Sequence, residues 1–373
     1  MQGALAGIRI ADFSRILAGP YATMLLADLG ADVVKVERPP LGDDTRQWGP
    51  PYDDTGNATY FQSINRNKRS VAIDLSTEEG RAQARQLIGS CDVVIENFVP
   101  GTMEKFGLGY DALSAENPGL VYASITGFGR SDIAASMPGY DLLVQAVGGL
   151  MSITGPDPSQ PTKVGVALVD VITGLYCAIG VLAALRHRDA TGEGQRVDVS
   201  LLGSTLSALV NQAGAFVGAG VTPRAMGNAH PSIAPYETFD TADRPLALAV
   251  GNDGQFRNCV QVLGLPELAD DPRFATNPER VRYREQLRPL LQNVLLQRGA
   301  DHWSDAFTDV GVPCGPVNTI NEAFALATRL GLDPIRKADG VATVANPIGL
   351  SRTPARYELR PPAVGGTDLD EVL

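Results

Sequence analysis

The chain has 373 residues, of which 44% are hydrophobic, and its formal net charge is −11. This length is enough for two domains, and the acidic balance argues against broad binding to nucleic acid or to an anionic membrane. The four cysteines lie far apart and the three histidines have no partner at metal-ligand spacing, so the sequence predicts neither a disulfide framework nor a metal site. The N-terminus shows no signal-peptide pattern, and we expect a cytoplasmic protein without a membrane anchor.

The first half of the chain alternates between apolar strands and helices. A helix is expected between the first two strands, and another opens with the capping-box pattern of Ser76 and Glu79. Strands separated by helices of this length are typical of a parallel, doubly wound α/β sheet. The expected strands are 8–13, 32–37, 70–75, 92–98, 120–128 and one beginning at Arg196.

The pattern changes from about Gly218. The segments YETFDT and PLALAVG are close enough to pair as a hairpin, and they are followed by helices over about 256–264, 278–298 and 301–310. We therefore predict a large Rossmann-like domain beginning in residues 1–217 and a smaller α+β domain over 218–312. Residues 313–373 are expected to return to the large domain.

The stretch KVGVALVDVITGLYCAIGVLAALRHR contains one charged side chain, Asp170, between Lys163 and Arg186. Its three glycines, its central Asp and its change of pattern argue against a membrane span. VGVALV is interpreted as a buried strand, and the apolar residues after Asp170 recur at helical spacing. Two roles are open for Asp170. It is either the N-cap of the following helix or a poorly solvated carboxylate nucleophile, and one position can serve both.

Short catalytic motifs are mostly absent. The first strand–helix–strand unit ends in the acidic Glu37, but its turn, SRILAGPYA, lacks the glycine fingerprint of a dinucleotide site. GxxxxGK[ST] and GxSxG are also missing, which argues against a P-loop NTPase and a serine hydrolase. The basic cluster NRNKRS is either a solvated loop or part of a phosphate-facing rim. That rim would comprise Lys35, Arg38, Arg46, Arg66, Lys68 and Arg69.

Longer blocks of sequence carry a specific resemblance. GIRIADFSRILAGPYATMLLADLGADVVKVERP, NRNKRSVAIDL, DVVIENFVPG, PGYDLLVQAVGGLMSITG and TGEGQRVDVSLL occur in order, and GVPCGPVNT follows them. Together they resemble the class III CoA-transferases, a family that also contains the α-methylacyl-CoA racemases. The resemblance extends from about Gly7 to the C-terminus.

This resemblance implies a Rossmann-like large domain, a smaller domain and an interlocked homodimer. It places the family's nucleophilic aspartate at Asp170, which would attack an acyl-CoA thioester through a mixed anhydride and then carry CoA as an aspartyl thioester. Such chemistry needs neither ATP nor a metal, and no tightly bound cofactor is expected. CoA thioesters and small organic acids are the expected substrates.

The resemblance also implies a set of CoA contacts. Arg38 and Lys105 would face phosphates, Asn97 would donate hydrogen bonds near the thioester, and Phe98 would pack on the pantetheine. Leu17 and Pro138 replace a Gln and a Lys of the oxalate-type members, which argues against oxalate specificity. The complete set is Leu17, Ala18, Arg38, Ile73, Asp74, Leu75, Ser76, Asn97, Phe98, Val99, Lys105 and Tyr140.

Two alternatives remain open. A racemase needs an acid/base pair, but Tyr140 stands where the family's histidine is expected, and Asn252 and Asp253 stand near the expected glutamate. A non-catalytic CoA-binding protein is the other alternative. For a transferase, succinyl-CoA and small dicarboxylates are the expected substrates, with Arg46, Arg66 and His230 as candidates for gripping a distal carboxylate.

Overall fold

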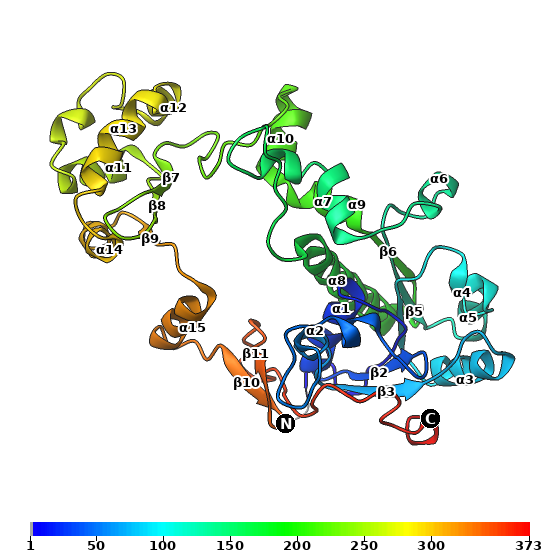
Figure 1. Cartoon of the computed structure of the whole chain (residues 1–373). Helices are drawn as coiled ribbons and strands as arrows, with labels where there is room; N and C mark the ends of the chain where they lie inside the picture. The colour runs from blue at the N-terminus through cyan, green and yellow to red at the C-terminus, as the bar shows by residue number, and fades with distance from the viewer. Residues whose placement is uncertain (1–2) are drawn as a thin grey trace. The chain divides into compact units, whose positions relative to one another are not determined.

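The computed structural model describes residues 3–373, which form two compact units (Figure 1). The first unit comprises the residues up to Leu150 together with Lys163–Thr222 and Asp333–Leu373. The second unit comprises Met151–Thr162 and Pro223–Leu332. Residues 313–332 thus group with the second unit because β9 (Cys314–Pro316) pairs with β8 (Leu246–Ala249), and the chain rejoins the first unit at Asp333.

A six-stranded parallel sheet with the strand order β3-β2-β1-β4-β5-β6 forms the centre of the first unit, as predicted. This is the order of a doubly wound dinucleotide-binding fold, in which the direction of winding reverses between β1 and β4. The strands are β1 (Arg9–Asp12), β2 (Asp32–Glu37), β3 (Lys68–Ala72), β4 (Val93–Glu96), β5 (Val121–Thr126) and β6 (Arg196–Ser200).

Helices cover both faces of this sheet. Apolar residues of α1 and α8 form one core with the inward residues of five strands, and α3, α4 and α5 pack on the opposite face. The helices of this unit are α1 (Ala18–Asp28), α2 (Thr59–Ile64), α3 (Glu78–Gly89), α4 (Thr102–Lys105), α5 (Tyr110–Glu116), α6 (Asp132–Ala135), α7 (Asp141–Val147), α8 (Leu168–Thr191), α9 (Leu201–Ala208) and α10 (Val210–Ala219). The hairpin of β10 (Ile335–Ala338) and β11 (Val341–Val344) completes the unit.

The second unit has a separate core beneath a three-stranded antiparallel sheet, β7-β8-β9. The predicted hairpin of β7 (Tyr236–Phe239) and β8 is confirmed. The helices of this unit are α11 (Asp253–Val262), α12 (Asn277–Arg282), α13 (Arg284–Leu295), α14 (Ala300–Asp309) and α15 (Ile320–Arg329).

Two local predictions are wrong. VGVALV forms no strand, and α8 already begins at Leu168, because the buried residues Val169, Thr173, Cys177 and Val181 follow one helical face from the start. The N-cap of α3 is Thr77, which accepts a hydrogen bond from the Gly80 amide at 2.9 Å, rather than Ser76. The hydroxyl of Ser76 instead donates to Asp74.

Candidate active site

Two cavities lie at the carboxyl ends of β1 and β4, where the winding of the sheet reverses and where open α/β sheets commonly bind ligands. The loop after β1 carries Arg15, and the loop after β4 carries Phe98. Both side chains line both cavities, so the cavities adjoin. We call them the Arg38 cavity, of about 270 Å³, and the Asp170 cavity, of about 320 Å³.

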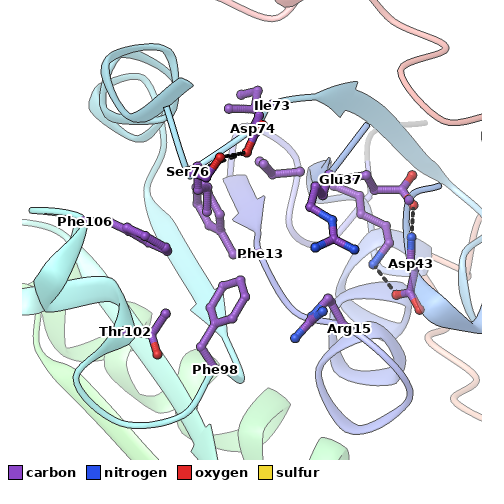
Figure 2. Close-up of a pocket in the computed structure, with 15 residues that line it drawn as sticks. Phe13, Arg15, Glu37, Asp43, Ile73, Asp74, Ser76, Phe98, Thr102 and Phe106 are labelled. Atoms are coloured by element: carbon purple, nitrogen blue, oxygen red, sulfur yellow. Dashed lines mark hydrogen bonds and ion pairs between the residues drawn. The ribbon is translucent and has the colours of Figure 1, made fainter. Parts of the chain in front are cut away.

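The Arg38 cavity contains half of the predicted CoA contacts. Figure 2 shows Phe98, Phe106 and Arg15 around this space, and the Arg15 guanidinium lies 5.3 Å from the centre of the Phe98 ring. A lining that combines aromatic rings with guanidinium groups suits a ligand that carries both a flat ring and phosphates. The predicted residues in its lining are Arg38, Ile73, Asp74, Leu75, Ser76 and Phe98.

The Asp170 cavity contains the other predicted residues, with one exception. Asp170 lies in its wall together with Leu17, Ala18, Asn97, Phe98, Val99 and Tyr140. An elongated ligand can therefore extend from the Arg38 cavity past Phe98 and reach the carboxylate. The exception is Lys105, which is exposed on α4 and lines neither cavity.

Asp170 lies in the first turn of α8, three residues after the N-cap residue Ala167, so the N-cap interpretation is wrong. Asp141 caps the helix instead. Its Oδ1 accepts hydrogen bonds from the amides of Val169 at 2.8 Å and Asp170 at 3.3 Å. The Asp170 carboxyl group is thus not used for capping. Burial, reinforced by the negative charge of Asp141, raises its pKa to about 7.

Asn97 holds the loop after β1. Its side-chain oxygen accepts from the Arg15 amide at 2.8 Å, and its side-chain nitrogen donates to the Arg15 carbonyl at 2.7 Å. Asn97 therefore fixes the loop after β1 and also lines the Asp170 cavity, so its predicted hydrogen bond near the thioester stays a prediction.

Most of the proposed basic rim pairs with carboxylates inside the protein. Lys35 pairs with Asp43, Arg46 with Glu37, Arg66 with Asp28, Lys68 with Asp12 and Arg69 with Asp32, at separations of 2.5 to 3.2 Å. Lys35 and Lys68 are fully buried. Arg38 differs from these five because its side chain is exposed and lines a cavity. The cluster is therefore mainly structural, since a buried cation needs a carboxylate partner.

The three side chains predicted to bind a distal carboxylate of the substrate lie elsewhere or are already paired. Arg46 and Arg66 are held by Glu37 and Asp28. His230 belongs to the second unit, where its Nδ1 accepts from the Ser232 amide at 3.1 Å. None of these three lines the Asp170 cavity as the structure describes it.

The two side chains that stand near the place of the racemases' glutamate are engaged elsewhere. Asn252 caps α11 by accepting from the Gln255 amide, and Asp253 forms an ion pair with Arg280 at 2.7 Å. Tyr140 lines the Asp170 cavity and is 62% exposed. Within residues 3–373, no cluster of three or more His, Cys, Asp or Glu side chains is placed to hold a metal ion.

Three residues of the site escaped the sequence analysis. Arg15 was detectable in principle, because it follows the first strand at the carboxyl edge of the sheet. Asp141 and Tyr60 were not, because only the folded chain brings them near Asp170. Burial and the negative charges of Asp170 and Asp141 raise the pKa of Tyr60 to about 12, so its hydroxyl stays protonated.

Comparison with known proteins shows the family of the chain. The profile of CoA-transferase family III matches residues 5–368. The succinate–glutarate CoA-transferase of Agrobacterium fabrum is 45% identical over 372 residues, covering 97% of this chain and 93% of that protein. The human succinyl-CoA:glutarate CoA-transferase is 38% identical over 373 residues, covering 99% of this chain and 85% of that protein.

A solved structure is similar over its whole length. The CAIB/BAIF family protein from Brucella suis superimposes with a TM-score of 0.89 at 43% identity, covering 98% of this chain and 97% of that chain. A family profile that spans nearly the whole sequence and relatives that are named for CoA transfer lead to one conclusion. The chain belongs to CoA-transferase family III and is a CoA-transferase.

Proposed function

We propose that the protein moves CoA from succinyl-CoA to a small dicarboxylic acid such as glutarate, with Asp170 as the nucleophile. The observation that carries this proposal is the position of the Asp170 carboxyl group in a cavity that adjoins a second, cation-bearing cavity. The nucleotide of CoA would occupy the Arg38 cavity. Its pantetheine arm would pass Phe98 and bring the thioester to Asp170.

Asp170 exchanges acyl groups in four balanced steps. Its carboxylate attacks the thioester carbonyl, which forms a mixed anhydride and releases CoA thiolate. The thiolate then attacks the aspartyl carbonyl, so that an aspartyl-CoA thioester forms and the donor acid leaves. The acceptor carboxylate attacks this thioester to give a second mixed anhydride and thiolate. The thiolate finally attacks the acceptor carbonyl, which yields the new acyl-CoA and regenerates Asp170.

The electrostatic setting of Asp170 supports this role. A carboxylate that is poorly solvated and faces a like charge is higher in free energy than one in water, and acylation removes that charge. Each step replaces one activated acyl bond by another, so the free energy of the thioester is preserved and ATP is not required. The relatives from Agrobacterium and human, whose names give succinate or succinyl-CoA and glutarate, support the choice of substrates.

The assembly and location that we propose are a cytoplasmic homodimer, with the interlocked topology that the family resemblance implies. Apolar side chains on one face of α8 and on α10 support an assembly, since Ile179 is 61%, Phe216 60% and Val217 83% exposed in the single chain. α8 is also the one helix among the described residues that is long and apolar enough to cross a membrane, with 44% of its apolar window buried. If a second copy of the chain covers the exposed apolar face of α8, this helix can be as apolar as it is without lying in a membrane. The four free cysteines are in keeping with a reducing compartment.

The decisive experiment is intact-protein mass spectrometry with peptide mapping after brief exposure to succinyl-CoA, glutaryl-CoA and acetyl-CoA. We expect a CoA adduct on the peptide that contains Asp170, no adduct in Asp170→Ala, and a loss of transferase activity of about 10³-fold or more in that variant. An Asp170→Ala protein with full activity would refute the proposal. Deuterium uptake at the α-carbon of a 2-methylacyl-CoA, without any adduct, would identify a racemase instead.

A further inference from the structure

The loop that joins β1 to α1 contains a strained residue between the two cavities. Ile16 has a φ of 71°, in the left-handed region that β-branched residues rarely adopt. Such a conformation costs about 1–3 kcal/mol and persists only where the surroundings enforce it. Arg15, before it, lines both cavities, whereas Ile16, Leu17 and Ala18 line only the Asp170 cavity. The strained residue therefore lies where the loop passes from the lining of both cavities to the lining of the Asp170 cavity alone.

Four hydrogen bonds enforce this conformation from two sides. On one side, Asn97 brackets Arg15 through its amide and carbonyl, at 2.8 and 2.7 Å. On the other side, Lys35 Nζ donates to the Ser14 carbonyl at 2.9 Å, and Asp43 Oδ1 accepts from the Ile16 amide at 3.3 Å. The backbone of three consecutive residues is thus held by side chains that are distant in sequence.

Lys35 and Asp43 also hold each other. Their charged groups are 2.9 Å apart, and their side chains are 0% and 1% exposed. Burial alone would lower the pKa of Lys35, but the carboxylates of Asp43, Asp12 and Glu37 raise it above its ordinary value. Burial alone would raise the pKa of Asp43, but Lys35 and Thr45 hold it below its ordinary value. Both groups therefore stay charged in a place where an isolated charge is costly.

We propose that the buried Lys35–Asp43 pair is a positioning device for CoA transfer: it holds Ile16 in its left-handed conformation, so that Arg15 faces the path of CoA and Leu17–Ala18 form the wall beside Asp170. This inference rests on the proposed reaction at Asp170. It explains why a buried ion pair stands in the wall of the Arg38 cavity, although a well-packed apolar pair is often equally stable. Lys35 and Asp43 act through the loop and not on the reacting atoms.

The double variant Lys35→Met/Asp43→Leu tests the proposal. It replaces both charges together and leaves neither unpaired, so the protein should remain folded. The Ser14 carbonyl and the Ile16 amide lose their partners, and so do the amide and hydroxyl of Thr45. We expect kcat/KM for succinyl-CoA, with glutarate as acceptor, to fall about 10- to 100-fold, because a small displacement of the residues that position a substrate has an effect of this size. The matched control is Arg188→Met/Asp92→Leu, which removes a part-buried ion pair at the opposite edge of the sheet and should retain the wild-type kcat/KM.

A second pair of variants tests the backbone directly and decides the question if the double variant does not fold. Ile16→Gly and Ile16→Ala both remove the side chain, but only Gly adopts a positive φ without strain. We expect the Gly variant to have the higher melting temperature and the higher kcat/KM, which reverses the order found at ordinary positions.

A folded double variant with wild-type kcat/KM would overturn the inference, and so would an Ala variant equal to the Gly variant in both measurements. Wild-type protein without CoA transfer would instead count against the proposed function, so the two failures are distinguishable.

Discussion

The carboxyl group of Asp170 lies where its charged form is disfavoured. Burial and the charge of Asp141 raise its pKa to about 7, well above the ordinary value of an aspartate. Asp141 is needed at this place because it caps α8. The same carboxylate therefore fixes the helix that carries Asp170 and increases the free energy of the charged nucleophile.

The pH dependence of the reaction should report this pKa. Only the carboxylate attacks a thioester, so kcat/KM for succinyl-CoA should fall about tenfold for each pH unit below about 7. Asp141→Asn keeps the oxygen that accepts from the α8 amides and removes the like charge, so its profile should move to lower pH. Steady-state kinetics between pH 5 and 9 measure both profiles. An unshifted profile in Asp141→Asn would show that Asp141 does not tune Asp170.

The same shift predicts an effect on stability. The pKa of Asp170 is higher in the folded protein than in the unfolded chain, so the folded state loses relative stability as pH rises from about 4 to about 7. Asp170→Asn has no charge to bury and should melt at a higher temperature than the wild type at pH 8. The difference in melting temperature should disappear near pH 4, where the buried side chain at position 170 is neutral in both proteins. Thermal melts monitored by circular dichroism at the two pH values check this, and a difference that does not depend on pH would contradict it.

At the scale of elements, the start of α8 decides how the site is built. The helical face of Val169, Thr173 and Cys177 is buried from the first turn, so the helix extends backward past Asp170. Asp170 is therefore placed by a rigid helix, and the helix is fixed by a side chain from α7. A nucleophile on a helix is held more precisely than one at the end of a flexible loop.

Removing the Asp141 cap should destabilise the first turn of α8. Asp141→Ala leaves the amides of Val169 and Asp170 without their acceptor and should lower the free energy of unfolding by about 1 kcal/mol. Asp141→Asn serves as the control, because it retains an oxygen at the same place. Urea unfolding at pH 5 keeps the like-charge contribution small. Equal stability of the Ala and Asn variants would show that the cap contributes little.

At the scale of the whole molecule, the strand order determines where ligands bind. The reversal between β1 and β4 leaves a crevice at their carboxyl ends, and both cavities lie there. The exposed apolar face on α8 and α10 belongs to the same unit but not to these cavities. Its exposure in a single chain is the feature that the proposed dimer explains.

A charge on this face should separate the proposed dimer. Ile179→Asp introduces a carboxylate at the centre of the apolar stretch of α8, where burial against a second copy would be costly. We expect the wild type to sediment as a dimer at micromolar concentration and the variant to shift toward the monomer. Ile133→Asp, on α6 at a residue that is 82% exposed, is the matched control and should remain dimeric. A monomeric wild type in analytical ultracentrifugation would refute the proposed assembly.

The sequence by itself determined the alternation of strands and helices, the parallel sheet and the family. Apolar runs such as DVVKVE have one stable place in a sheet covered on both faces, and β2 occupies the predicted residues 32–37. The long blocks of resemblance also led to Asp170 and to a set of predicted CoA contacts, all of which except Lys105 line one of the two cavities.

Only the tertiary structure decided which charges face a ligand. Lys35, Arg66 and Lys68 were predicted at a phosphate-facing rim, but each pairs with a carboxylate supplied by another segment of the chain. The capping of α8 by Asp141 and the bracketing of Arg15 by Asn97 likewise join residues 28 and 82 positions apart. A short sequence pattern records the type and order of residues, whereas the pairing and the pKa of a buried charge depend on neighbours that only folding brings together.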